Sequence, residues 1–439
     1  MREFEFTFEE GLRKGLRNEG VEPFKDHRLV ELKNLRPSEF GLRPVETLTN
    51  PFSATFVWPF PQMMLLRELR LMCTETAIYT CDSSWSPTVA IDSLVAGGMW
   101  HVADFGQFVL LTNGSQIVQR HGSTGVWSSF TSTSAIPAMN TMCAFKGRVV
   151  GGNLSSWYDC DSRYVAWSDI GSASFLPDIK NTAGYVPLER NGSVLRVLPL
   201  GDMVAVYGTD GVALLRPANQ YMGLKQLDLP GLPNRNAVAS SDQAHVFVDY
   251  AGELWMLGAD GKAKNMGFGE YIGLMDAAEL VVSYNRQARE FYISDGDVGY
   301  VLGEHGLCQT HQLASSVEFD SGVLYATYES DGDTGGYVTT DVLDLGLRAF
   351  KTLATLACGC SSASDMWTRV YWRSDVRSSF SSGEWQWVNP SGFTTPMITA
   401  EDFKLAFKAE DYTDVKLAYF KARTKLSDKR MIRGIYSAN

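Results

Sequence analysis

The sequence predicts an all-β fold: a β-propeller of six or seven blades with an N-terminal extended arm and a small C-terminal β-sandwich-like module. The 439 residues include 40 Gly and 12% aromatic residues, a composition that favours short strands and tight turns over long helices. Short apolar runs are repeatedly followed by a glycine-containing turn and a second apolar run, which is the pattern of a β-hairpin. These hairpins recur at a spacing typical of propeller blades.

The hairpins of the central region are the basis for the predicted propeller. One example runs from the apolar segment 203–207 through a turn into segment 212–215. The turn glycines are Gly114, Gly152, Gly211, Gly252, Gly296 and Gly332, which lie 36 to 59 residues apart. Repeats of roughly 40–50 residues with about four strands each are typical of propellers, and a closed ring hides the sheet edges. We therefore expect the propeller to span residues 61–345.

Residues 1–60 show a different pattern. Phe4, Phe6 and Phe8 alternate as they would in a strand, whereas segments 35–44 and 50–52 contain prolines that oppose regular structure. This segment is expected to be an arm that adds a strand to the ring or reaches a neighbouring subunit.

Residues 346–439 are expected to form a separate all-β module. Runs such as 369–373, 384–388, 404–408 and 415–421 alternate at period two, and turn clusters separate them. The end of this module is the most basic part of the chain, with Lys421, Arg423, Lys429, Arg430 and Arg433.

Composition limits the functional classes. The formal net charge of −11 argues against a nucleic-acid-binding protein, because phosphate contacts need a basic surface. No run approaches the roughly 20 apolar residues of a membrane helix, and the first residues lack the order of a signal peptide. We therefore expect a protein that folds in a cytoplasm. The seven scattered cysteines fit buried free thiols better than a disulfide framework.

Candidate metal and catalytic motifs are few. His305 and His311 flank Cys308, and Cys358 is separated from Cys360 by one residue, but neither spacing is that of a standard zinc site. No nucleophile elbow, Walker loop or dinucleotide-binding glycine motif occurs. No catalytic, cofactor-binding or metal-ligating residue is therefore predicted, and the chain is expected not to be an enzyme.

Two sequence features leave alternatives open. The Ser-Asp-Gly-Asp segments 294–297 and 330–333 place carboxylates close together, as calcium loops do, although Asp295 and Asp331 fit better as caps of their own turns. The tryptophan-rich segments 367–372 and 384–387 fit either sugar stacking or cross-strand packing.

Three segments of the chain resemble the tail nozzle or hub proteins of short-tailed, podovirus-type bacteriophages. The first comprises Asn34–Pro44 and Asn50–Phe52. The second comprises Val165–Gly171, Gly184–Leu188 and Val197–Tyr207, and the third comprises Ala422–Lys425 and Asp428–Gly434. The likeness lies in the general residue pattern and in the order of segments along nearly the whole chain, rather than in one diagnostic motif.

The resemblance implies a structural virion protein of the phage tail, assembled in the host cytoplasm. Such subunits form a ring, usually of six copies, that encloses the DNA-ejection channel and contacts adaptor and fibre proteins. DNA would pass without specific binding, so we expect an acidic channel wall with the basic tail residues turned away from it. The alternatives are a head-to-tail adaptor or fibre-attachment hub and, from another class, a propeller glycosidase or sugar-binding protein.

Overall fold

A computed structural model of the chain describes residues 3–18, 27–52, 57–67, 69–155, 157–188, 190, 192–218, 221–241, 243–346, 348–362 and 365–427. The chain forms two compact units that interleave along the sequence, whereas three consecutive segments were expected. The propeller unit comprises residues 48–297 and 313–329, and the sandwich unit comprises residues 1–47, 298–312 and 330–439. Within the described residues, no helix has the length and apolar character needed to cross a membrane.

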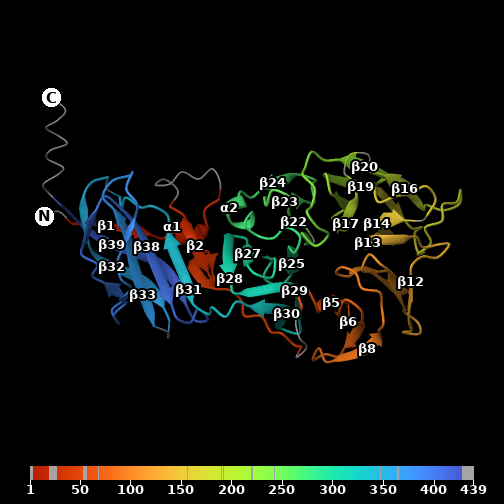
Figure 1. Cartoon of the computed structure of the whole chain (residues 1–439), viewed down its shortest axis with the longest axis horizontal. Helices are drawn as coiled ribbons and strands as arrows, with labels where there is room; N and C mark the ends of the chain where they lie inside the picture. The colour runs from red at the N-terminus through yellow and green to blue at the C-terminus, as the bar shows by residue number, and fades with distance from the viewer. Residues whose placement is uncertain are drawn as a thin grey trace. The chain divides into compact units, whose positions relative to one another are not determined.

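The propeller unit contains five four-stranded antiparallel sheets in chain order (Figure 1). Each sheet is one blade, with its strands hydrogen-bonded in sequence order. Blade 1 has β5 (Gln62–Leu66), β6 (Leu69–Cys73), β7 (Ile78–Cys81) and β8 (Pro87–Ile91). Blade 2 has β9 (His101–Asp104), β10 (Phe108–Thr112), β11 (Ile117–His121) and β12 (Trp127–Phe130). Blade 3 has β13 (Ala138–Phe145), β14 (Arg148–Ser155), β15 (Tyr164–Trp167) and β16 (Gly184–Pro187).

Blades 4 and 5 repeat the arrangement, and two further hairpins complete a seven-bladed propeller. Blade 4 has β17 (Val194–Leu200), β18 (Met203–Gly208), β19 (Val212–Ala218) and β20 (Tyr221–Gln226). Blade 5 has β21 (Val238–Ser240), β22 (Ala244–Val248), β23 (Leu254–Gly258) and β24 (Ala263–Asn265), followed by α2 (Gly269–Ile272). Blade 6 begins with β25 (Val281–Asn285) and β26 (Glu290–Ser294), and blade 7 holds β29 (Gln312–Asp320) and β30 (Val323–Ser330).

The start of the propeller segment completes its last blade. Thr49 forms a parallel bridge with Tyr325 of β30, and its backbone is hydrogen-bonded to Leu324 and Ala326. Blade 7 therefore contains chain from before blade 1 and from after blade 6. This pairing closes the ring of blades within one chain and covers the outer edge of β30. Thr49 is an isolated bridge rather than a strand, so the expected addition of a strand by the N-terminal segment stays a prediction.

The propeller core lies between neighbouring blades. Val150 and Val165 of blade 3 pack with Val204 and Val206 of blade 4 in one buried cluster. Two similar clusters join blade 1 to blade 2 and blade 2 to blade 3. Because each blade is apolar on both faces, the blades stack around an axis rather than forming two layers.

Most of the expected hairpin turns are present, and one is not. Gly114, Gly252, Gly296 and Gly332 adopt positive φ angles of 77° to 95°, which glycine tolerates without strain. Gly152 does not mark a turn: it lies inside β14, and the chain turns earlier, at Lys146 and Gly147. The adjacent Gly151 and Gly152 reflect close packing, since a Cβ on Gly151 would lie 2.3 Å from the Met139 sulfur and one on Gly152 would lie 2.6 Å from Val194.

The sandwich unit consists of two β-sheets. One sheet has the order β3 (Leu35–Ser38), β4 (Gly41–Pro44), β39 (Lys416–Leu426), β32 (Lys351–Ser361) and β36 (Phe393–Thr394), with β1 (Glu3–Phe8) on β39 and β37 (Ile398–Ala400) on β32. The other contains β28 (Gly306–Thr310), β2 (Leu29–Lys33), β31 (Gly336–Thr340), β38 (Asp402–Ala409), β33 (Met366–Arg373) and β34 (Ser381–Ser382). Strand β27 (Gly299–Gly303) pairs with β28, β35 (Gln386–Trp387) pairs with β33, and α1 (Glu10–Lys14) follows β1.

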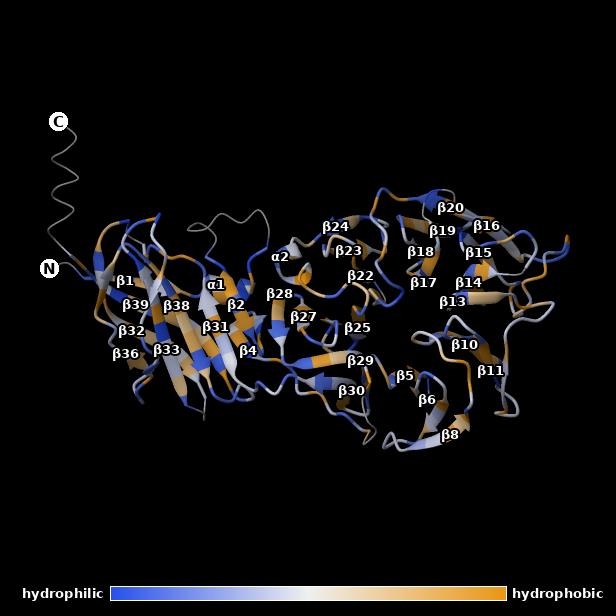
Figure 2. Cartoon of the chain, in the orientation of Figure 1, coloured by the Kyte–Doolittle hydropathy of each residue, from blue (hydrophilic) through white to orange (hydrophobic). Residues whose placement is uncertain are grey.

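The sandwich uses more of the chain than the predicted module at 346–439. Strand β1 pairs with β39 from Glu3–Lys425 to Phe8–Phe420, so two strands that are remote in the sequence are neighbours in one sheet. Phe420 is buried and contacts Phe8 on one strand and Phe407 on another. Figure 2 shows hydrophobic and hydrophilic residues alternating along these strands, which is the signature of one buried and one solvated face.

Candidate functional site

The propeller axis contains a cavity of about 430 Å³. Its walls come from the first strand of every blade, namely β5, β9, β13, β17, β21, β25 and β29. Because alternate residues of these strands point inward, the cavity combines apolar side chains such as Met64 and Leu198 with isolated polar ones. A second cavity of about 350 Å³ shares Ser240, Arg286 and Glu318 with the first. A central cavity is where a propeller places ligands, so it is the candidate site of this unit.

Four charged residues line the central cavity: Asp104, Arg196, Arg286 and Glu318. Asp104 is already paired, because Arg67 lies 3.1 Å from its carboxylate. Burial raises the pKa of Glu318 to about 7, although a backbone hydrogen bond from Leu65 and the charge of Arg286 favour the ionised form. Glu318 is therefore only partly ionised at neutral pH. The sequence analysis did not predict these four charged residues as a site. A single charged residue within an otherwise apolar strand, such as Arg196 within 194–200, could have indicated them.

Blade 7 is tied to blade 1 beside this cavity. Ser316 Oγ accepts a hydrogen bond from the Met63 backbone at 2.9 Å, and Glu318 accepts one from Leu65 at 3.2 Å. Further along the same strand, Asp320 receives two hydrogen bonds from the Arg70 guanidinium, of which the Nη2–Oδ1 bond is 3.0 Å long. Hydrogen bonds and an ion pair therefore contribute to the closure of the propeller, in addition to apolar packing.

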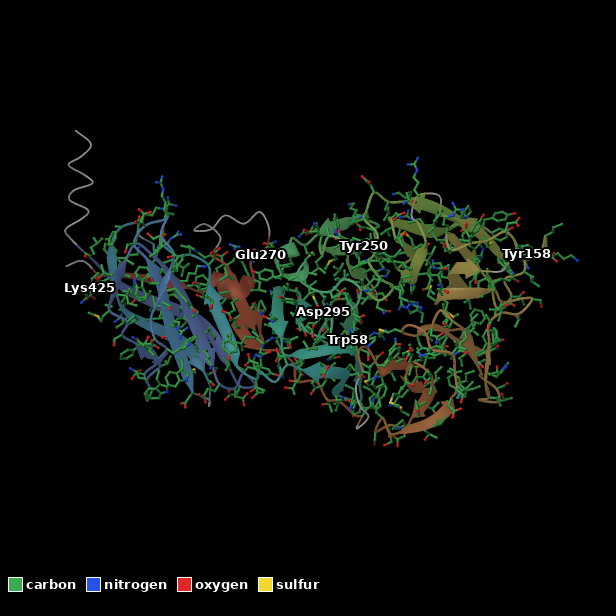
Figure 3. The ribbon with its side chains drawn as sticks, viewed as in Figure 1. Trp58, Tyr158, Tyr250, Glu270, Asp295 and Lys425 are labelled. Carbon is green, nitrogen blue, oxygen red and sulfur yellow. The ribbon has the colours of Figure 1, made fainter. Side chains whose placement is uncertain are left out.

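The two Ser-Asp-Gly-Asp segments form the same turn. The Asp295 carboxylate accepts a hydrogen bond from the Asp297 backbone at 3.0 Å, and Asp331 accepts one from Asp333 at 2.9 Å. In each loop the preceding serine hydroxyl also accepts a bond from the turn glycine. The prediction that these aspartates cap their own turns is confirmed. The first turn packs against Trp58, which Figure 3 shows beside Asp295 and whose indole N–H donates to the Glu279 carbonyl at 2.9 Å.

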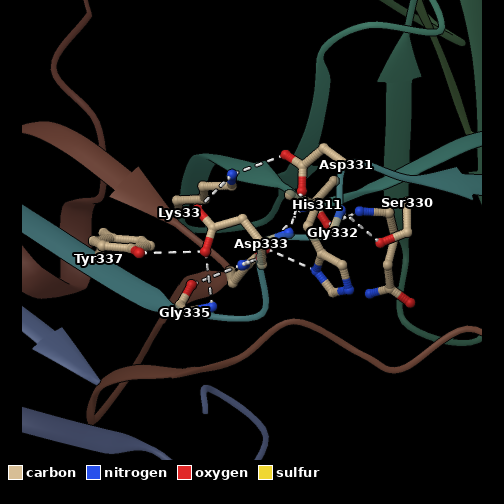
Figure 4. Close-up of polar contacts among 11 residues, drawn as sticks. Lys33, His311, Ser330, Asp331, Gly332, Asp333, Gly335 and Tyr337 are labelled. Carbon is tan, nitrogen blue, oxygen red and sulfur yellow. Dashed lines mark hydrogen bonds and ion pairs between the residues drawn. The ribbon is translucent and has the colours of Figure 1, made fainter. Parts of the chain in front are cut away.

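The second loop already holds a cation from the chain itself. Lys33 Nζ lies 2.8 Å from Asp331 and 3.0 Å from Asp333, as Figure 4 shows. Burial opposes the charged ammonium, but the hydrogen bonds of the two aspartates outweigh it and hold the pKa of Lys33 above its usual value. Among the described residues, no group of three His, Cys, Asp or Glu side chains is arranged to hold a metal ion.

Asn34 fixes this loop to its neighbours. Its side-chain amide donates to the carbonyls of Asp333 and Gly335 at 2.9 and 2.8 Å, while its Oδ1 accepts from the His311 backbone at 2.8 Å. Its Oδ1 also lies 3.0 Å from His311 Nδ1, so that ring nitrogen carries the proton. Burial lowers the pKa of His311, which keeps the ring neutral. The loop is therefore a structural junction of the sandwich unit.

Replacing Lys33 with methionine should lower the free energy of unfolding by about 1–2 kcal/mol at pH 7, because two carboxylates then lose their shared cation. The pKa of Asp333 is lowered in the folded protein despite burial, mainly by its bond to Lys33. A lowered carboxyl pKa stabilises the fold above the unfolded value near ~4 and loses that effect as pH falls. In urea unfolding, the difference between wild type and Lys33→Met should therefore be larger at pH 7 than at pH 3.5.

The control for this prediction is Lys146→Met. Lys146 forms an ion pair with a single aspartate, Asp202, and both side chains are exposed to solvent. We expect no measurable change there, because exposed pairs contribute little. Calcium should not raise the melting temperature of the wild-type protein, since Lys33 occupies the place of a cation. A clear calcium-dependent rise, or equal losses in both variants, would contradict this interpretation of the loop.

The cysteines and the histidine pair around Cys308 do not form a metal site within the described residues. All seven cysteines are free thiols, as expected. Burial raises the pKa of Cys308 to about 12 and that of Cys360 to about 12, so neither thiol ionises readily. His305 lies exposed in the turn after β27, apart from the buried His311.

The tryptophan-rich segments and the basic tail have local partners. Trp367 pairs with Trp387 across β33 and β35, and Arg369 lies over the Trp385 ring at 4.6 Å. On β39, Lys421 and Arg423 form ion pairs with Glu5, and Lys425, labelled in Figure 3, pairs with Glu3. Lys429, Arg430 and Arg433 lie outside the described residues.

Comparisons with known proteins give structural likenesses alone. No protein-family model matches the chain, and no curated protein matches it. Among solved structures, PorZ of Porphyromonas gingivalis, a bacterial surface component of the type IX secretion system, aligns with a TM-score of 0.38 at 9% identity. That alignment covers 63% of this chain but only 35% of PorZ, so the chain spans about a third of that protein.

Two other solved structures are similar at the same level. Hsv2p of Kluyveromyces lactis aligns with a TM-score of 0.35 at 9% identity, over 61% of this chain and 84% of Hsv2p. The extracellular domain of a putative one-component system from B. thetaiotaomicron aligns with a TM-score of 0.43 at 9% identity, over 79% of this chain and 54% of that domain. The propeller assignment rests on the strand topology of the chain itself.

Proposed function

We propose that this chain is a structural protein of a short phage tail, a nozzle or hub subunit that assembles into a ring around the DNA-ejection channel. The proposal rests on the positions, in the fold, of the segments that resemble phage tail proteins. Asn34–Pro44 forms β3 and β4, and Ala422–Lys425 belongs to β39, which joins β4 in one sheet. The middle segments fall on β15, β16, β17 and β18 of blades 3 and 4, which share one buried core.

The surface of blade 3 supports an assembled state. The connection between β15 and β16 exposes three large aliphatic side chains, and the Ile179 side chain is fully exposed. Its neighbours Ile170 and Leu176 are exposed as well. At the edge of the same blade, Tyr158, which is labelled in Figure 3, is exposed. It stacks on Tyr185 with ring centroids 5.9 Å apart. A connection that exposes several large apolar side chains is suited to contact with another protein surface.

The charge distribution fits passage of DNA without binding. The chain carries a net charge of −11, and three basic residues of β39, Lys421, Arg423 and Lys425, form ion pairs with Glu5 or Glu3. A basic surface would retain the duplex through counterion release, whereas paired cations attract phosphate weakly.

The solution mass of the purified full-length chain tests the assembly. We expect a cyclic oligomer, with six copies as the expected number, because a conduit needs a head-to-tail interface whose rotation closes. Native mass spectrometry across a concentration series measures this directly. A single chain at every concentration would contradict the ring.

A further inference from the structure

The central cavity of the propeller contains a cation without a counter-charge. Arg196 projects from β17 into the cavity, and its Nε is buried without a hydrogen-bond partner. Among the described residues, no ion pair involves Arg196. Burial, together with the nearby charge of Arg235, lowers the pKa of Arg196 to about 9, so the guanidinium stays charged at neutral pH. The Arg196 side chain as a whole is half-buried. Burying part of a guanidinium without a partner is costly, and a ligand that supplies the opposite charge would remove that cost.

A second orphaned polar group lines the same cavity. Ser283 lies on β25, and its hydroxyl is buried without a hydrogen-bond partner. Most other polar side chains around it are satisfied: Gln62 bonds to both backbone groups of Trp100, and Ser316 bonds to Met63. A guanidinium and a hydroxyl are both hydrogen-bond donors, and an oxyanion accepts from both.

The acidic residues of the cavity do not neutralise Arg196. Asp104 is paired with Arg67. Burial raises the pKa of the Glu318 carboxyl to about 7, which disfavours its charged form, and the opposing charge that acts on it is that of Arg286. Arg235, the other buried guanidinium nearby, donates to the carbonyls of Asn113 and Asn140, which are neutral acceptors. The cavity is therefore positive, with apolar walls between its charged groups.

We propose that the propeller cavity binds a small organic carboxylate, whose oxygens pair with Arg196 and accept a hydrogen bond from Ser283. The apolar part of the ligand contacts inner-strand side chains such as Leu198 and Val282, which line the same cavity. An inorganic oxyanion would satisfy the guanidinium but leave these walls without contacts. The volume of about 430 Å³ lies within the range of small-molecule sites.

The test is a thermal-shift titration of the full-length protein with sodium butyrate, with inorganic phosphate at equal ionic strength as the comparison. We expect butyrate to raise the melting temperature of the wild-type protein by ~3 °C or more at saturation and phosphate to leave it unchanged. Arg196→Met should abolish the shift. Its ligand-free melting temperature should equal or exceed that of the wild type, because an unpaired buried charge is removed.

Two further variants separate binding from folding. Ser283→Ala removes only the orphaned hydroxyl, so it should fold normally and bind butyrate at least 3-fold more weakly. Arg163→Met removes an exposed arginine from another surface and should keep the full butyrate shift. A shift retained in Arg196→Met, a response to phosphate alone, or no response to either anion would each overturn the proposal.

Discussion

Replacing Arg70 with methionine should lower the free energy of unfolding by about 3–5 kcal/mol, because it leaves Asp320 buried without its counter-charge. Asp320 is 8% exposed and lies on β29, while Arg70 lies on β6. The pair therefore joins the last blade of the propeller to the first. Its loss weakens the contact that closes the ring of blades, and urea unfolding at pH 7 would measure the effect.

The pH dependence identifies the cause of this loss. Hydrogen bonds from Arg70 lower the pKa of Asp320. A lowered carboxyl pKa contributes stability above the unfolded value near ~4 and loses it as pH falls through the folded value. The difference between wild type and Arg70→Met should therefore be largest at neutral pH and shrink towards pH 3.

The matched control is Arg163→Met. Arg163 makes the same type of ion pair with Asp161, but both side chains are about half exposed. Its removal should produce no measurable change, since exposed pairs contribute little. Equal losses for Arg70→Met and Arg163→Met, or a loss that persists unchanged at acid pH, would show that the Arg70–Asp320 pair does not hold the closure.

Replacing Phe420 with alanine should cost about 3–5 kcal/mol, because it opens a cavity in the sandwich core. Phe420 is fully buried and contacts Phe8 of β1 and Phe407 of β38. The loss should also loosen β1, because Phe8 packs on the ring that is removed. Hydrogen exchange of the β1 amides, together with chemical unfolding, would measure both effects.

Phe393→Ala provides the same chemical change on an exposed site. Phe393 lies on β36 of the same sheet and is 38% exposed, so its truncation should cost no more than about 1 kcal/mol. If Phe420→Ala were no more destabilising than Phe393→Ala, β1 and β39 would not share a core.

The propeller was predictable from sequence because its signal is local and repeated. Turns such as Asn113–Gly114 and Asp295–Gly296 carry their own chemistry, and the spacing between them predicts the blades. The turn expected at Gly152 was wrong because a glycine required for close packing, here against Val194, has the same appearance in sequence as a turn glycine.

The sandwich was harder to predict because its pairings are remote. Strand β1 pairs with β39 across more than 400 residues, and no local pattern in Phe4, Phe6 or Phe8 indicates the partner. The expectation of an extended arm followed from the prolines of segments 35–44, yet Pro37 and Pro44 are accommodated within the short strands β3 and β4.

The candidate site was not predictable because its residues come from separate blades. Arg196, Ser283 and Glu318 each interrupt an inner strand, and only closure of the ring brings them to one cavity. The junction at Lys33 is similar: the Ser-Asp-Gly-Asp loop was visible in the sequence, but the lysine that compensates it lies about 300 residues away. Charge pairs between residues so far apart in the chain cannot be recognised from the local sequence pattern.

Electron microscopy of the purified full-length chain tests the proposed role most directly. A nozzle or hub subunit predicts closed rings of identical copies with an axial hole, whose wall is predominantly acidic in the reconstruction. Single propeller-shaped particles without rings, or rings whose lumen is lined mainly by the basic residues Lys421 and Arg423, would contradict the account.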